Sequence, residues 1–145
     1  MKILVAIDFS DMSRRALAWA LAHAEHVVPH ELHLVHVVED SWLDLFASRA
    51  TTKLEEEMEL LARQAEAELA RLPEEVQESM RPIHRHLRRG APHKHIVQVA
   101  EEIDADMLVV GSYGRGGLER TILGSVAERI VRDARTTVVI VRPRS

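Results

Sequence analysis

The sequence contains no cysteine, no asparagine, three lysines and few aromatic residues. Without cysteine the chain can form no disulfide, no thiolate metal site and no cysteine nucleophile. Two Trp, one Tyr and two Phe offer few surfaces on which the bases of a single-stranded nucleic acid could stack. The formal net charge of −4 is the opposite of the basic footprint of a nucleic-acid-binding protein. We therefore expect no nucleic acid partner.

Long apolar runs are also missing. No run approaches the roughly 20 apolar residues that a membrane-spanning helix needs, so we expect no membrane partner. The N-terminal apolar run at 3–7 meets Asp8, which makes it too short for a signal-peptide core and typical of a buried strand. We expect a cytoplasmic location and, because 145 residues show no linker or shift in composition, a single domain over residues 1–145.

Short apolar runs alternate with longer amphipathic stretches along the chain. The predicted strands are 3–7, 32–38, 83–87, 107–110 and 137–141. The predicted helices begin after Ser10 or Asp11, at a capping box that starts at Thr52, after Pro92, and at Ser125. This order predicts an α/β fold with a mostly parallel sheet covered on both faces. The polar alternation of 83–87 favours an edge strand.

Five of the six glycines fall within 111–124, between a predicted strand and a predicted helix. Glycine lets a ligand approach the backbone closely, and a helix N-terminus favours phosphate. The segment has no lysine and is not a P-loop, and Glu119 stands where a dinucleotide-binding fingerprint needs its third glycine. Two interpretations of Ser125 remain open: its hydroxyl binds a phosphate, or it caps the next helix in a capping box with Glu128.

The spacing Gly111, two residues, Gly114, nine residues, Gly124-Ser125 matches the nucleotide-binding signature of the ATP-binding universal stress proteins. The runs at 3–8, 34–37, 90–92 and 138–141 also look like that family, so the resemblance covers nearly the whole chain. It implies a five-stranded, parallel, doubly wound sheet of order 3-2-1-4-5, with helices on both faces. In that order the direction in which successive strands are added reverses between the first and fourth strands, and ligands of such folds bind at this point.

The resemblance implies the following ligand-contacting residues: Asp8, Val37, Gly111, Gly114, Arg115, Gly124 and Ser125. Gly114, Gly124 and Ser125 would contact phosphates, Asp8 and Gly111 the nucleoside. Backbone groups near Val37 would hold the adenine edge, and Arg115 would add positive charge. The implied ligand is ATP, with ADP or AMP as alternatives, accompanied by Mg²⁺. For Asp8 a second interpretation stays open, in which it only organises the start of the first helix.

The leading hypothesis is an adenine-nucleotide-binding protein of stress response or regulation. The alternatives are a slow ATP hydrolase or nucleotidyl-transfer enzyme, and an interaction module with an empty site. We identify no catalytic residue, and the missing P-loop lysine removes one source of phosphate charge stabilisation, so at most slow hydrolysis is expected. The strand 137–141 is apolar and uncharged, and the family pairs this last strand with a second copy, which predicts a homodimer.

Two groups of polar residues are interpreted as non-functional. His84 and His86 fall on one side of a strand and could share a metal, but the spacing offers no third ligand, so no metal site is predicted. His33 and His36 are expected to be structural. The acidic residues of the long second helix are interpreted as a solvated outer face: Glu55, Glu56, Glu57, Glu59, Glu66 and Glu68.

Overall fold

The computed structural model describes residues 1–24, 31–39, 49–114 and 123–144. Its elements in chain order are β1 (Lys2–Ala6), α1 (Asp11–Ala24), β2 (Glu31–Val38), α2 (Arg49–Leu69), α3 (Glu74–Ser79), β3 (His84–Arg89), α4 (Pro92–Glu102), β4 (Met107–Gly111), α5 (Ser125–Asp133) and β5 (Thr137–Val141). Each predicted strand is therefore present, with bounds that shift by one or two residues.

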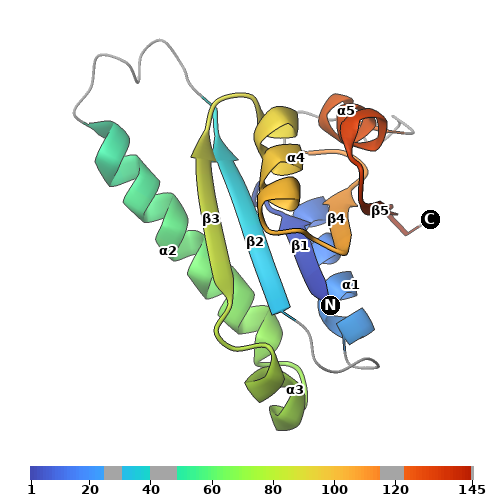
Figure 1. Ribbon diagram of the computed structural model, residues 1–145. Helices are drawn as coiled ribbons and strands as arrows, with labels where there is room; N and C mark the ends of the chain where they lie inside the picture. Colours follow the sequence, from blue (N-terminus) through green and yellow to red (C-terminus); the bar gives the residue numbers. More distant parts are fainter. Residues whose placement is uncertain (25–30, 40–48, 115–122, 145) are drawn as a thin grey trace.

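The five strands form one parallel sheet in the order β3-β2-β1-β4-β5 (Figure 1). This confirms the predicted fold class and strand order. The central strands β1, β2 and β4 are buried on both faces and mostly apolar, as strands covered from both sides must be, although β2 also buries His33 and His36. The polar strand β3 lies at one edge, as its alternation predicts, and β5 lies at the other.

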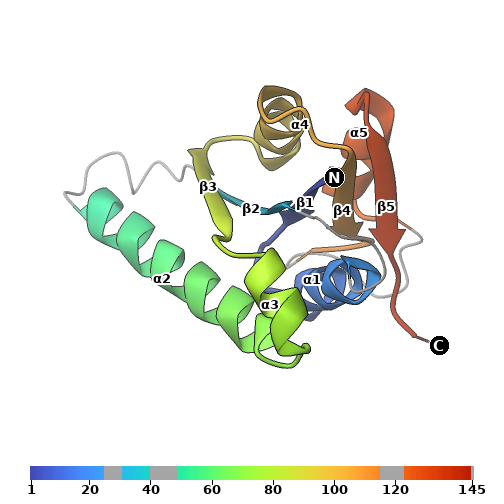
Figure 2. The ribbon, with the colours of Figure 1, turned by 60° about the horizontal axis from the view of Figure 1, so that its bottom comes forward.

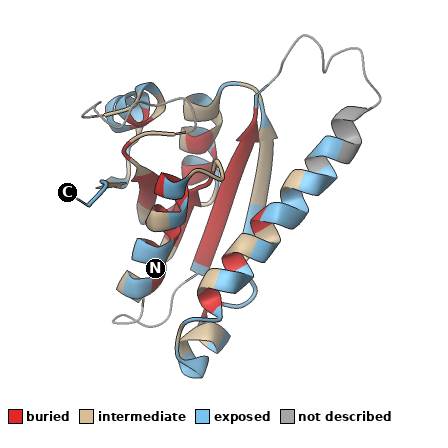
Figure 3. Ribbon diagram, turned by 180° about the vertical axis from the view of Figure 1, so that it is seen from behind, coloured by how far each residue is buried: buried red, intermediate tan, exposed pale blue. Residues whose placement is uncertain are grey.

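Helices cover both faces of the sheet (Figure 2). On one face α1 and α2 bury Leu17 and Leu61 against alternate strand residues such as Val5. On the other face α4 and α5 bury Val99 and Ile130 against the residues between them in the strands. Figure 3 shows the result: the buried residues concentrate in β1 and β2, while β3 is less covered. The period of two in the strands thus separates two apolar cores.

Two helical details differ from the sequence prediction. Helix α2 begins at Arg49, three residues before the capping box at Thr52, so the predicted start is wrong and Thr52 lies inside the helix. The short helix α3, which begins after Pro73, was not predicted, because a proline is as compatible with a helix start as with a helix end. None of the described helices is long and apolar enough to cross a bilayer.

Candidate functional site

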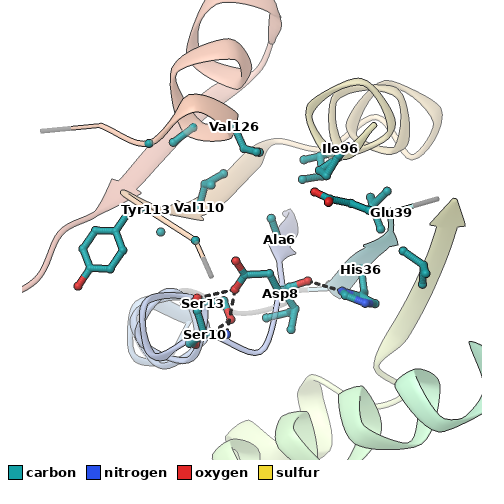
Figure 4. Close-up of a pocket in the computed structure, with 18 of the residues that line it drawn as sticks. Ala6, Asp8, Ser10, Ser13, His36, Glu39, Ile96, Val110, Tyr113 and Val126 are labelled. Carbon is teal, nitrogen blue, oxygen red and sulfur yellow. Dashed lines mark hydrogen bonds between the residues drawn. The ribbon is translucent and has the colours of Figure 1, made fainter. Parts of the chain in front are cut away.

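A cavity of about 700 Å³ opens at the carboxyl ends of β1, β2 and β4. Its size falls in the range of small-molecule sites. It lies where the strand order reverses between β1 and β4, because the chain leaves these two strands towards helices on opposite faces of the sheet. Figure 4 shows the labelled side chains of its apolar side, Ile96, Val110 and Val126, and of its polar side, Asp8, Ser10 and Ser13.

The structure brings together six of the seven residues that the sequence singles out. All six line the cavity: Asp8, Val37, Gly111, Gly114, Gly124 and Ser125. They come from the ends of β1, β2 and β4 and from the start of α5, four segments that are far apart in the sequence. Arg115, the seventh residue, lies outside the described residues.

Asp8 builds a tight turn between β1 and α1. Its Oδ1 accepts hydrogen bonds from the backbone N–H of Ser10, at 2.9 Å, and from the Ser10 hydroxyl. The Ser10 oxygen in turn accepts a bond from the N–H of Ser13, at 3.2 Å, and so caps α1. Between them Phe9 takes a left-handed backbone conformation with φ 65°. Asp8 therefore does organise the first helix, and its second oxygen, Oδ2, faces Gly114.

The glycines at positions 111, 114 and 124 are each in close contact with a neighbour. An ideal Cβ at Gly111 would lie 2.9 Å from the Cβ of Met12 in α1. One at Gly114 would lie 2.5 Å from Asp8 Oδ2, and one at Gly124 would lie 3.1 Å from the Cα of Tyr113. A side chain at any of these positions would require its neighbour to move, so packing favours glycine there independently of any ligand.

Helix α5 points its N-terminus at the cavity. Gly124 is the N-cap, its N–H is bonded to the Ser112 carbonyl, and its own carbonyl accepts the N–H of Glu128 at 2.9 Å. The N–H groups of the next three residues, 125–127, have no partner within the helix, as at any helix start. All three residues line the cavity. The site therefore offers hydrogen-bond donors and the positive end of a helix dipole.

The capping box predicted at Ser125 is not formed. Ser125 is the first helical residue rather than the cap, and the Glu128 carboxylate pairs instead with Arg132, one turn along the helix, at 3.2 Å. No hydrogen bond engages the Ser125 hydroxyl among the described residues. Of the two interpretations of Ser125, the structure removes the cap and leaves the hydroxyl at the cavity wall.

Sequence reasoning missed part of the cavity wall. His36, Lys53 and Glu57 all line it. His36 is buried and donates from Nδ1 to the Ile7 carbonyl at 2.7 Å, so its Nε2 is directed towards Glu57 Oε2, 3.5 Å away. This buried Glu57 oxygen has no hydrogen-bond partner among the described residues.

Glu57 also corrects the interpretation of α2 as a solvated acidic face. Its side chain is only 16% exposed, and that of Glu68 only 15%, whereas Glu55, Glu56 and Glu59 are exposed. Consecutive helical residues are turned by about 100° from one another, so an unbroken acidic run cannot all face solvent. The helical spacing of the neighbouring apolar residues in the sequence could have shown that Glu57 lies on the inward-facing side of α2.

Comparisons with known proteins agree with this architecture. The profile described as the universal stress protein family matches residues 1–142. Universal stress protein MJ0531 of Methanocaldococcus jannaschii is 33% identical over 97% of this chain and 81% of its own length. Among solved structures, that of the hypothetical protein MJ0577 has a TM-score of 0.81 at 26% identity, covering 99% of this chain and 96% of its own. A universal stress protein in complex with cAMP has a TM-score of 0.72 at 27% identity, covering 99% and 98%.

Proposed function

The chain belongs to the universal stress protein family, and from that premise we propose that it binds an adenine nucleotide, ATP in the first place, in the cavity between β1 and β4. One observation carries the proposal. Six residues from four distant segments, chosen from the sequence for nucleotide contact, line a single cavity of about 700 Å³.

The phosphates would bind at the start of α5. The N–H groups of Ser125, Val126 and Ala127 have no helical partner, and the Ser125 hydroxyl is not used as a cap. Together with the helix dipole they form a preorganised anion site. Gly114 and Gly124, which leave no side chain between this helix start and Asp8, would let phosphate oxygens reach the backbone.

The adenine would bind at the end of β2. The Val35 carbonyl accepts the N–H of Ile7, the last backbone–backbone bond between β2 and the β1 segment in the described residues. Carbonyl directions alternate along a strand, so the Val37 carbonyl is directed to the same side one step farther on, beyond the end of β1. It would accept a bond from the adenine amino group, while Ile96 and Val110 would pack on the faces of the base.

We expect Mg²⁺ to accompany the nucleotide, because of the charge of the cavity wall. Three carboxylates line it, from Asp8, Glu39 and Glu57, against one described lysine, Lys53. A bare triphosphate would be repelled by this wall, and Mg²⁺ takes carboxylate and phosphate oxygens as ligands. Asp8, whose Oδ2 faces the Gly114 side of the cavity, is the residue that would hold the ion or the ribose.

The similar universal stress protein in complex with cAMP supports the choice of ligand class. That protein is 27% identical over nearly the whole chain, so it resembles this chain in sequence as well as in fold. We extend the ligand class, an adenosine phosphate, to this chain, and retain ADP and AMP as alternatives to ATP. We also propose a cytoplasmic location, because an ATP-binding protein needs a compartment that contains ATP.

Calorimetric titration of nucleotide-free protein with MgATP tests the proposal. We expect one site per chain, and competition experiments with ADP, AMP and cAMP then rank the affinities of the ligands.

The variant Ser125→Ala removes one hydrogen bond to a charged group and should weaken MgATP binding about 10-fold or more. The matched control is Ser79→Ala, which removes a helical hydroxyl bonded to the Val76 carbonyl outside the cavity and should leave affinity unchanged. Absence of heat and of any thermal shift at millimolar MgATP would refute nucleotide binding and leave the interaction module.

The remaining parts of the proposal concern assembly and chemistry. Residues 1–145 would act as one domain, paired with a second copy along β5, the apolar edge strand. Such a homodimer would act as a nucleotide-responsive regulatory unit, because the end of β4, where the ligand would bind, pairs with β5, the strand that would carry the interface. Hydrolysis, the second candidate activity, would be slow, because no lysine of a P-loop is present to stabilise the developing phosphate charge.

A further inference from the structure

Four polar side chains gather at the end of the sheet opposite the cavity, where β2 and β3 begin. Strand pairing sets His33 beside His84, and His86 lies two residues farther along β3 on the same face. Glu31, two residues before His33 on β2, completes the group. We call these four residues the β2–β3 cluster. The parallel register joins two sequence segments that are about 50 residues apart.

The contacts within the β2–β3 cluster centre on His33, which is buried. Its Nε2 lies 3.1 Å from Glu31 Oε2, and its Nδ1 lies 2.9 Å from His86 Nε2. Its ring stacks on that of His84, with centroids 4.3 Å apart. One ligand atom each from Glu31, His33 and His84 lies within 4.8 Å of the others. This group includes His84 but not His86, so it differs from the His84 and His86 pair that the sequence suggested.

Burial and neighbouring charge set the protonation of these groups. Burial lowers the pKa of His33 and of His86, and the mutual proximity of the two rings lowers the pKa of His86 further. The hydrogen bond from His33 lowers the pKa of Glu31. For His33 and Glu31 these directions favour the neutral imidazole and the carboxylate, which are the forms that bind metal ions.

We propose that the β2–β3 cluster binds one Zn²⁺ through a Glu31 carboxylate oxygen, His33 Nε2 and a ring nitrogen of His84. Tetrahedral Zn²⁺ with bonds of about 2.0–2.2 Å separates its ligand atoms by about 3.4 Å. The His33 and Glu31 atoms lie 3.1 Å apart, close to this spacing. The His84 ring, on an edge strand, is stacked on His33 with the ring planes 13° apart, so it must turn out of this stack to direct a nitrogen at the same ion; its ligand atom lies within 4.8 Å of the other two.

His86 is the positioning residue of this site. When His33 Nε2 binds a metal, its Nδ1 must carry the proton, and His86 Nε2 is placed at 2.9 Å to accept it. Histidine ligands commonly donate their second ring N–H to such an acceptor, which fixes the tautomer and the ring orientation. In the metal-free cluster the neutral His33 ring carries its one proton on Nε2, facing Glu31. Zn²⁺ binding therefore requires the His33 tautomer protonated at Nδ1 and the His86 tautomer protonated at its own Nδ1, which both rings reach by proton exchange with solvent and without net loss of a proton. The Glu31 oxygen turns from hydrogen-bond acceptor to metal ligand.

The types of ligand atom in the cluster indicate which metal ion it would bind. Two imidazoles and one carboxylate suit Zn²⁺ and its neighbours among the divalent transition metals, whereas Mg²⁺ prefers oxygen ligands alone. Three protein ligands leave a fourth position for water. The site would tie the edge strand β3 to β2, and it lies at the opposite end of β2 from the nucleotide cavity, so the proposal does not depend on nucleotide binding.

Calorimetric titration of tag-free, chelator-treated protein with Zn²⁺ in the absence of nucleotide tests the site. We expect one Zn²⁺ per chain and a melting temperature that rises with Zn²⁺. His84→Ala and, separately, Glu31→Gln should each weaken binding about 100-fold or more, since loss of even a supporting residue costs about 10–100-fold. The matched control is His23→Ala on α1, a histidine stacked on Trp19 on the other side of the sheet, which should bind as the unmodified protein does.

Variants of His86 separate a positioning role from a general effect on packing. His86→Leu should weaken Zn²⁺ binding about 10–100-fold, whereas His86→Gln, which keeps a hydrogen-bond acceptor, should recover most of the affinity. Circular dichroism of each variant checks its fold, and β3 is an edge strand that tolerates such changes. The proposal is overturned if the unmodified protein takes up no Zn²⁺ at micromolar concentration. It is equally overturned if His84→Ala and Glu31→Gln, both folded, bind Zn²⁺ as tightly as the unmodified protein.

Discussion

A methyl group at position 114 tests how the cavity is built. The Cβ of Gly114→Ala would lie 2.5 Å from Asp8 Oδ2, whereas even a favourable contact between carbon and oxygen is about 3.3 Å long. The carboxylate would have to retreat by about 0.8 Å. Its other oxygen is held by the N–H and the hydroxyl of Ser10, so the retreat strains the turn that starts α1.

The expected cost of Gly114→Ala is moderate. Inserting a methyl group into a packed contact costs about 1–3 kcal/mol, and weakening the bonds from Ser10 to a charged Asp8 falls in the same range. For a chain of this length the melting temperature changes by about 4 °C per kcal/mol, so we expect it to fall by about 4–12 °C. The affinity for MgATP should fall as well, because the displaced carboxylate moves within the cavity.

A double-mutant cycle with Asp8→Ala isolates the contact. Without the carboxylate the methyl group at position 114 meets no close atom of the described residues, so the second substitution should cost almost nothing, and the two effects on unfolding free energy should couple by about 1 kcal/mol or more. Urea unfolding measures each corner of the cycle. Gly124→Ala, whose Cβ would meet Tyr113 instead, is the control and should be additive with Asp8→Ala. Additivity of Gly114→Ala within about 0.5 kcal/mol would refute the reasoning.

Four further outcomes are expected. Gly124→Val should lose MgATP binding, because its side chain fills the space before α5 and presses on Tyr113, and unchanged affinity in calorimetry would count against a phosphate site there. Turnover of ATP should stay below about 1 per second, and a phosphate-release assay in the ordinary enzyme range of about 1–1000 per second would restore the enzyme hypothesis. Light scattering at micromolar concentration should give a mass near twice the 16.4 kDa of the chain, whereas the mass of one chain would exclude the β5 dimer. Gly90→Ala should lower the melting temperature by several degrees, because φ is +127° there and the new Cβ would lie 2.8 Å from His95 Nε2; an unchanged value would show that the turn adapts.

The architecture was predictable because strands buried on both faces leave a plain signal. Runs such as 3–7 and 107–110 are apolar without alternation, and 83–87 is polar, which separates central strands from an edge. The order of the strands came from the family resemblance, since pairing partners are not written in any one segment. The start of α2 was misplaced because a capping box describes a local preference, which the helix from Arg49 overrides.

The candidate site was predictable only where its residues follow a local rule. Glycines and a helix start lie together in the sequence, so the phosphate side of the cavity was visible. His36 and Glu57 were missed, because β2 and α2 meet only in the folded chain. The β2–β3 cluster was missed for the same reason: the register that sets His33 beside His84 is a property of strand pairing.

The packing around the glycines changes what their spacing proves. Gly111 is packed against Met12 and Gly124 less tightly against Tyr113, so packing alone favours glycine at both positions even if the cavity never held a ligand. Glycine spacing alone therefore does not separate a nucleotide-binding protein from an interaction module with an empty site. The separation rests on the Ser125 hydroxyl, because packing does not require it and the helix does not use it as a cap. The helix N–H groups beside it are present at any helix start and do not distinguish the two functions. An empty module has no use for this hydroxyl at the wall of a cavity of about 700 Å³, so the response of MgATP affinity to Ser125→Ala decides between the two functions.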